Sequence, residues 1–225
     1  GMMKRLKVAL ILPLSFLLLS CESSEDAKTS EAQACLDSAR GGTEASTCMS
    51  KVDGIESPAA SRIRVGAVYM QRGFGTCSFV SAYNNLKTPP AGTDATVATF
   101  SYLAFTGTNT FRDSATPSQD ADFVFAEAVK SGSGGLIWLT TGTKIAALAN
   151  LTVVGDAAGL QAAISGLNNT DLGNLALQVN SSYCGGSSAS TTTACKEFNS
   201  AITQGGSDPA AVGAALKALL NNTSN

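Results

Sequence analysis

The sequence contains no histidine, and only 6% of its residues are aromatic, with a single tryptophan. Without an imidazole the chain cannot build a Ser–His–Asp or Cys–His catalytic centre, or a histidine-ligated zinc site. Charged residues are also few, at 14%, and the formal net charge is −2. An acidic chain without a basic cluster is a poor binder of nucleic acid. We therefore predict a non-catalytic protein that binds neither metal nor nucleic acid.

The first 20 residues have the pattern of a secretory leader. A basic stretch at 4–7 precedes an uncharged apolar run at 8–20, which is shorter than the ~20 residues of a membrane-spanning helix. The run ends in LLSC at 18–21, and this ending resembles the lipobox of bacterial lipoproteins. The resemblance implies that residues 1–20 are removed and that Cys21 carries a covalent lipid, with no other cofactor expected. Two or three acyl chains hold a protein stably on a bilayer.

Two alternatives to this interpretation are a plain signal peptide with a chance cysteine and a transmembrane anchor. The lipoprotein interpretation places the chain in a bacterial cell envelope. Glu22 follows Cys21, where aspartate is the better-known signal for retention in the inner membrane. The outer membrane is therefore the favoured location. Residues 21–30 are short, acidic and Ser-rich, and we predict that they tether the lipid to a folded domain at 31–225.

Cysteine spacing predicts two disulfides. Cys35 and Cys48 are placed symmetrically about Gly41-Gly42, so a helical hairpin that turns at these glycines would bring the two cysteines together. Cys184 and Cys195 flank a segment with almost no apolar residues. Closure of this loop by a disulfide is the favoured interpretation, and a metal-binding pair is the weaker one. Cys77 is then left as a buried free thiol, or as a replacement for one partner of the first pair.

The remaining patterns predict a mostly α-helical domain. Residues 31–40 and 44–53 flank the glycine pair as two helices. A Pro-led helix from 58 to 72 and a helix at 76–86 follow, so that 31–86 forms two hairpins. At 93–105 strand and buried helix are both compatible with the sequence. Further helices are expected at 116–131, 136–150, 156–167 and 207–219, the second of them interrupted near Gly142. We interpret Asp120 and Asp122, at the start of the 116–131 helix, as solvent-exposed acids.

One segment of the first part also resembles a tetratricopeptide unit. In RVGAVYMQRGFGTCSFVSAYNNL, at 64–86, Val65-Gly66 and Tyr69 match the Leu-Gly-x-x-Tyr of that family's first helix. Gly73 stands at the interhelix glycine and Ser78 at a small packing position. The resemblance implies an antiparallel helix pair and a role as an assembly or transport adaptor. The other interpretation is a generic helical hairpin with Tyr69 in its core.

Two functions fit these features. The first is a non-catalytic, membrane-anchored envelope lipoprotein that acts as a helical scaffold for a protein partner. The second is a lipoprotein that binds a small molecule or a lipid in a pocket between helices, for which tetratricopeptide-type lipoproteins associated with solute transporters are a precedent. Tyr69 and Trp138 are the candidate binding residues for either function.

Lipidation gives the first testable prediction. Replacing Cys21 by Ser should abolish incorporation of labelled fatty acid, because the thiol is the acceptor of the lipid. The measurement is metabolic labelling followed by gel electrophoresis, with Cys77→Ser as the matched control that keeps its label. Continued labelling of the Cys21→Ser protein would eliminate the lipoprotein interpretation.

Overall fold

The computed structural model describes residues 24–185 and 195–222, so the predicted lipobox and most of the 184–195 loop lie outside the described residues. All secondary-structure elements in the described part are helices, which confirms the mostly α-helical prediction. Their bounds are α1 (Ser24–Ser38), α2 (Gly42–Ser50), α3 (Pro58–Gln71), α4 (Thr76–Lys87), α5 (Ala95–Ser101), α6 (Pro117–Ser131), α7 (Gly134–Leu148), α8 (Ala157–Ile164), α9 (Asn169–Val179), the single-turn η2 (Asn180–Cys184), α10 (Lys196–Gly205) and α11 (Pro209–Leu220).

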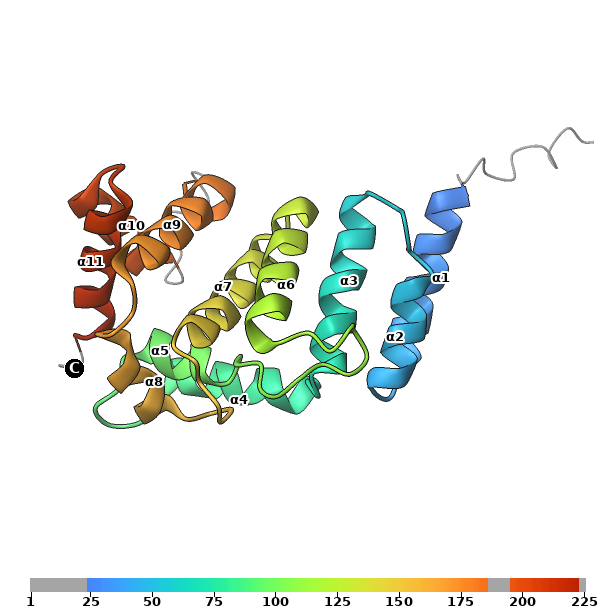
Figure 1. Ribbon diagram of the computed structural model, residues 1–225, viewed down its shortest axis with the longest axis horizontal. Coiled ribbons are helices and arrows are strands. Elements are labelled where there is room, and N and C mark those ends of the chain that lie inside the picture. The colour runs from blue at the N-terminus through green and yellow to red at the C-terminus, as the bar shows by residue number, and fades with distance from the viewer. Residues whose placement is uncertain (1–23, 186–194, 223–225) are drawn as a thin grey trace, which may run out of the picture.

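The helices are arranged as an elongated row (Figure 1). Helices α1, α2 and α3 stand side by side at one end, α6 and α7 pair in the middle, and α9, α10 and α11 form the other end. Helices α4, α5 and α8 run along one edge of this row. Among the described residues, no helix combines the length and the apolar character needed to cross a membrane.

The first hairpin forms as predicted. Cys35 and Cys48 are joined by a disulfide between α1 and α2, with Gly41-Gly42 at the turn. Helix α1 begins at Ser24, seven residues before the predicted helical segment, so most of the expected tether is helical. Residues 24–30 are almost all exposed. They therefore extend α1 beyond the packed part of the hairpin without adding to the core.

The second predicted hairpin does not form. Helix α3 packs on α2 and α6, whereas α4 packs on α5 and crosses the end of α3 at a large angle (Figure 1). The cause lies between the two helices. Gly73 adopts a left-handed φ of 84°, and the buried Phe74 donates its N–H to the Tyr69 carbonyl. Phe74 thus folds back under α3 and directs the chain sideways, so the helix pair implied by the tetratricopeptide resemblance is absent.

Glycine has an unexpected role in α7. The predicted interruption near Gly142 is wrong, because α7 runs without a break through this residue. A Cβ on Gly142 would lie 2.4 Å from the Phe100 ring and 2.9 Å from the Leu103 side chain. Only a residue without a side chain at position 142 therefore allows the 95–103 segment to approach α7 this closely. This segment consists of the short helix α5 and the two residues after it. The helical alternative for 93–105 is the correct one.

The C-terminal end contains two helices that the sequence patterns did not predict, α9 and α10. Asn168 ends the predicted helix but also caps the next one, because its side chain accepts the Asp171 N–H. Helices α9 and α11 make the tightest crossing in the described structure. A Cβ on Gly173 would lie 1.7 Å from the Pro209 carbonyl oxygen, and a Cβ on Gly213 would lie 1.8 Å from that of Asn169.

This crossing gives the second prediction. Gly173→Ala should lower the free energy of unfolding by about 1–3 kcal/mol, because backbone meets backbone and neither helix can yield without losing contacts. The matched control is Gly135→Ala in α7, where a Cβ would meet nothing within 4 Å and alanine should be neutral or stabilising by up to about 1 kcal/mol. The measurement is urea unfolding followed by circular dichroism. Equal stability of the two variants would contradict the crossing.

Candidate binding groove

A buried aromatic cluster closes the C-terminal end of α3. The Tyr69 ring meets Phe74 edge to face at 5.2 Å between centroids, and Phe105 at 4.8 Å. The Tyr69 hydroxyl is hydrogen-bonded to Thr143 Oγ1 on α7. Burial raises the pKa of Tyr69 well above its ordinary value, and the bond to Thr143 offsets only part of this rise. Tyr69 is therefore a neutral side chain that joins α3 to α7.

One face of this cluster forms the floor of an apolar groove of about 470 Å³. This volume is in the range of pockets that hold ligands. The groove lies between α1, α3, α4 and α7, and no charged side chain lines it. Its lining residues are Leu36, Ala39, Val65, Gly66, Tyr69, Met70, Phe74, Gly75, Thr76, Phe79, Leu136 and Leu139. The predicted binding residue Tyr69 is thus part of the site.

The groove continues onto the outer surface of α4. Phe79 lines the groove and is 37% exposed, and three further apolar side chains of α4 are exposed, Val80 at 51%, Tyr83 at 59% and Leu86 at 41%. Only Ala82 of this helix is buried. The single charged residue between Gly73 and Thr93 is Lys87, whose ammonium group lies over the Tyr83 ring. Helix α4 therefore presents an apolar, nearly uncharged face to the surroundings.

Cys77 belongs to the same helix, and its predicted burial is wrong. It is a free thiol at the exposed start of α4, because the disulfides Cys35–Cys48 and Cys184–Cys195 use the other four cysteines of the described part. The second disulfide confirms the predicted closure of the 184–195 loop and eliminates the metal-pair alternative. Among the described residues, no group of three or more His, Cys, Asp or Glu side chains could hold a metal ion.

Trp138, the other predicted binding residue, does not line the groove. Its ring packs between Phe100 of α5 and Phe198 of α10, with centroid distances of 5.2 Å to each. Helical periodicity alone could not separate Trp138 from Tyr69, since both are aromatic residues on helices. A better indication of the site in the sequence is the α4 segment itself, which has four large apolar residues and almost no charge.

A buried ion-pair network fixes the wall behind the cluster. Arg72, at the end of α3, donates through Nε to Asp120 Oδ2 at 2.8 Å, and the two side chains are 2% and 0% exposed. Its other nitrogens donate to the carbonyls of residues 106, 107 and 115. Asn109 donates to Asp120 Oδ2 at 2.8 Å, and Arg112 lies 3.2 Å from Oδ1. The predicted exposure of Asp120 is thus wrong, because α6 begins against this loop and turns Asp120 inward.

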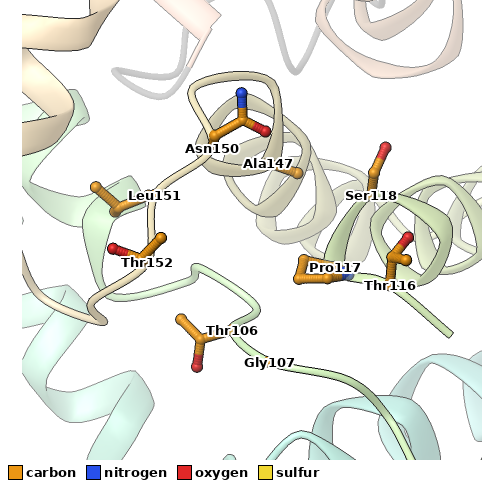
Figure 2. Close-up of a pocket in the computed structure, with 9 residues that line it drawn as sticks. All are labelled: Thr106, Gly107, Thr116, Pro117, Ser118, Ala147, Asn150, Leu151 and Thr152. Atoms are coloured by element: carbon orange, nitrogen blue, oxygen red, sulfur yellow. The ribbon is translucent and has the colours of Figure 1, made fainter. Parts of the chain in front are cut away.

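A second hollow lies between the loop at 106–107, the start of α6 and the end of α7 (Figure 2). Its volume is about 260 Å³, and four of its nine lining residues carry a hydroxyl group, namely Thr106, Thr116, Ser118 and Thr152. Figure 2 shows Thr106 and Thr152 on one side and Pro117 on the other. None of its lining residues is titratable, so this hollow offers hydrogen bonds but no acid–base chemistry.

Comparison with protein-family models, curated proteins and solved structures finds no match for this chain. The function must therefore be inferred from the groove and the surfaces around it.

The ion-pair network gives the third prediction. Arg72→Met should lower the free energy of unfolding by about 3 kcal/mol or more, because it removes a buried partner of Asp120 and the donors to three carbonyls. Lys51→Met is the matched control, since Lys51 pairs with Glu31 at the surface and such pairs contribute about 1 kcal/mol or less. Thermal unfolding of both variants is the measurement. A loss for Arg72→Met no larger than that for Lys51→Met would contradict the role of the network.

Proposed function

We propose that the protein is a lipid-anchored envelope lipoprotein whose groove binds an apolar helical segment of a partner protein. The observation that carries this proposal is the continuity of the groove with the exposed face of α4. Contiguous exposed apolar surface on a water-soluble domain marks an interaction site. Amphipathic helices commonly bind in such grooves through apolar side chains at i, i+3, i+4 and i+7.

The shape of the surface favours a protein segment over a small ligand. Pockets for small molecules bury most of the ligand surface, whereas Val80, Tyr83 and Leu86 lie outside the groove and would remain exposed beside a small ligand. A helix laid along α4 would cover both parts together. The absence of charge among the groove-lining residues indicates that contact is apolar and that specificity depends on shape.

The proposed anchor leaves this surface accessible. Cys21 precedes Ser24 by three residues, which span at most about 11 Å. Helix α1 then extends about 22 Å, and the groove residues Leu36 and Ala39 lie in its last turn and directly after it. With the lipid on Cys21, the groove is thus held about one helix length from the point of attachment. A partner in the aqueous phase can therefore reach the groove. The outer membrane is the favoured location of the anchor.

The alternative, a carrier of a small apolar molecule or lipid, would use the groove alone. It is supported by the groove volume and the apolar lining. The two functions differ in their dependence on the outer face of α4. A carrier does not need Tyr83, while a helix-binding scaffold does.

The fourth prediction follows from this difference. Phe79→Asp and Tyr83→Asp should each reduce recovery of a stoichiometric protein partner by tenfold or more, since each places a carboxylate in an apolar contact and tenfold corresponds to about 1.4 kcal/mol. The measurement is affinity purification of the acylated protein in detergent, with mass spectrometry of both proteins and small molecules.

Ala126→Asp is the matched control, because Ala126 is exposed on α6 and does not line the groove. Its partner recovery should equal that of the unmodified protein. Retention of a small molecule that is lost with Phe79→Asp but not with Tyr83→Asp would favour the carrier. Equal recovery from all three variants would eliminate the groove as the binding surface.

A further inference from the structure

The junction between α5 and α10 combines an apolar and a polar contact. Trp138 of α7 lies between the rings of Phe100 and Phe198, so it bridges α5 and α10. Glu197 immediately precedes Phe198 in the first turn of α10. The Thr96 hydroxyl of α5 donates to Glu197 Oε1. The same short stretch of α10 therefore carries both contacts.

Asp94 completes the polar contact. It is the N-cap of α5, and its side chain accepts the N–H groups of Thr96 and Val97. The carboxyl groups of Asp94 and Glu197 thus both bond to Thr96, Asp94 to its N–H and Glu197 to its hydroxyl. Two ionised carboxylates held on the same residue repel each other, and a proton on either of them removes this repulsion. The arrangement is therefore most stable when the pair of carboxyl groups holds one proton.

We propose that Asp94 and Glu197, with Trp138 between Phe100 and Phe198, form a proton-dependent latch that holds the start of α10 against α5. In the closed latch, Asp94 and Glu197 together hold one proton. Loss of this proton leaves two carboxylates facing each other, and their repulsion separates Glu197 from Asp94. Helix α10 stays attached to the domain, because it packs on α11 and follows the disulfide to Cys184.

The basic side chains near Asp94 and Glu197 do not neutralise these two carboxyl groups in place of the proton. Within the described residues no lysine or arginine nitrogen forms an ion pair with Asp94 or Glu197; Lys144 pairs with Asp122, and Lys87 lies over Tyr83. Besides Glu197, the charged or titratable residues on α10 and on the elements that pack against α5 and α10, helix caps included, are Cys77, Tyr83, Lys87, Lys144, Asp156, Asp171, Tyr183, Lys196, Asp208 and Lys217.

Burial is the main cause that raises the pKa of Glu197 to about 7, and the charge of Asp94 adds to the rise. Burial also raises the pKa of Asp94. Because the folded state binds the proton more tightly than the unfolded state, stability is greatest below the unfolded pKa and is lost as the pH rises toward 7. The latch is therefore closed in mildly acidic conditions and opens near neutrality.

The single tryptophan of the chain reports directly on this junction. The test is a fluorescence titration of the full-length protein in detergent between pH 5 and 8.5, with far-ultraviolet circular dichroism recorded on the same samples. We expect the emission of Trp138 to shift to longer wavelength with a midpoint near pH 7, while the helical signal is unchanged. A simultaneous loss of helical signal would show global unfolding and would overturn the latch.

Two variants make the test specific. Glu197→Gln keeps a hydrogen-bonding side chain without a titrating proton, and Asp94→Asn keeps the helix cap, so both should remove the shift near pH 7. Glu56→Gln, an exposed acid on another loop, and Asp156→Asn, the cap of α8, are the matched controls and should titrate like the unmodified protein. Emission that is independent of pH, or an unchanged titration in Glu197→Gln, would overturn the proposal.

Discussion

The buried contact between Arg72 and Asp120 is the constraint on which the candidate groove depends. It joins the end of α3 to the start of α6. Arg72 also donates to three carbonyl groups of the 106–115 loop, which precedes α6, and so fixes this loop. Arg72 also lies 5.3 Å above the Phe105 ring, and Phe105 in turn packs on Tyr69 and Phe74. Since Tyr69 and Phe74 line the groove, the ion pair supports, through Phe105, a surface that contains no charge itself.

Another arginine, Arg64 in the middle of α3, acts in a similar way. Arg64 is buried, lies 3.5 Å from Glu127 of α6, and donates to the carbonyls of Val52 and Ile55 after α2. Helix α3 is therefore attached to both neighbours by buried charge as well as by apolar packing. Buried charges without partners are strongly destabilising, so these contacts also specify which helices pair. Small residues then set how closely the helices approach, as at Gly142 and at the crossing of Gly173 with Gly213.

Much of the helical content and both disulfides of the described part could be predicted from local patterns. The Thr116–Gln119 capping box and the Pro-led starts of α3 and α11 mark helix ends through contacts within a few residues. The symmetric placement of Cys35 and Cys48 about a glycine turn is also a local signal. The sequence does not predict helix α9, because its cap, Asn168, also follows directly on the end of the predicted 156–167 helix.

Tertiary contacts explain the remaining errors. The same glycine signal marks a chain break at Gly73 but a close helix contact at Gly142, and only the packed neighbours distinguish these cases. Asp120 carries no sign of its burial, because Arg72 lies 48 residues away in sequence. Tyr69, a predicted binding residue, lines the groove, whereas Leu36, Leu136 and Leu139 join it from helices whose pairing no sequence pattern indicated.

Crosslinking from Cys77 would test the central claim most directly, because this free thiol is exposed at the start of α4. A photoactivatable reagent attached to Cys77 of the full-length protein would be activated in its own envelope, and the crosslinked peptides would be sequenced. We expect adducts with one protein, within a segment that has apolar residues at helical spacing and competes for the groove. Adducts with lipid alone, or spread over many proteins without a common segment, would contradict a helix-binding scaffold.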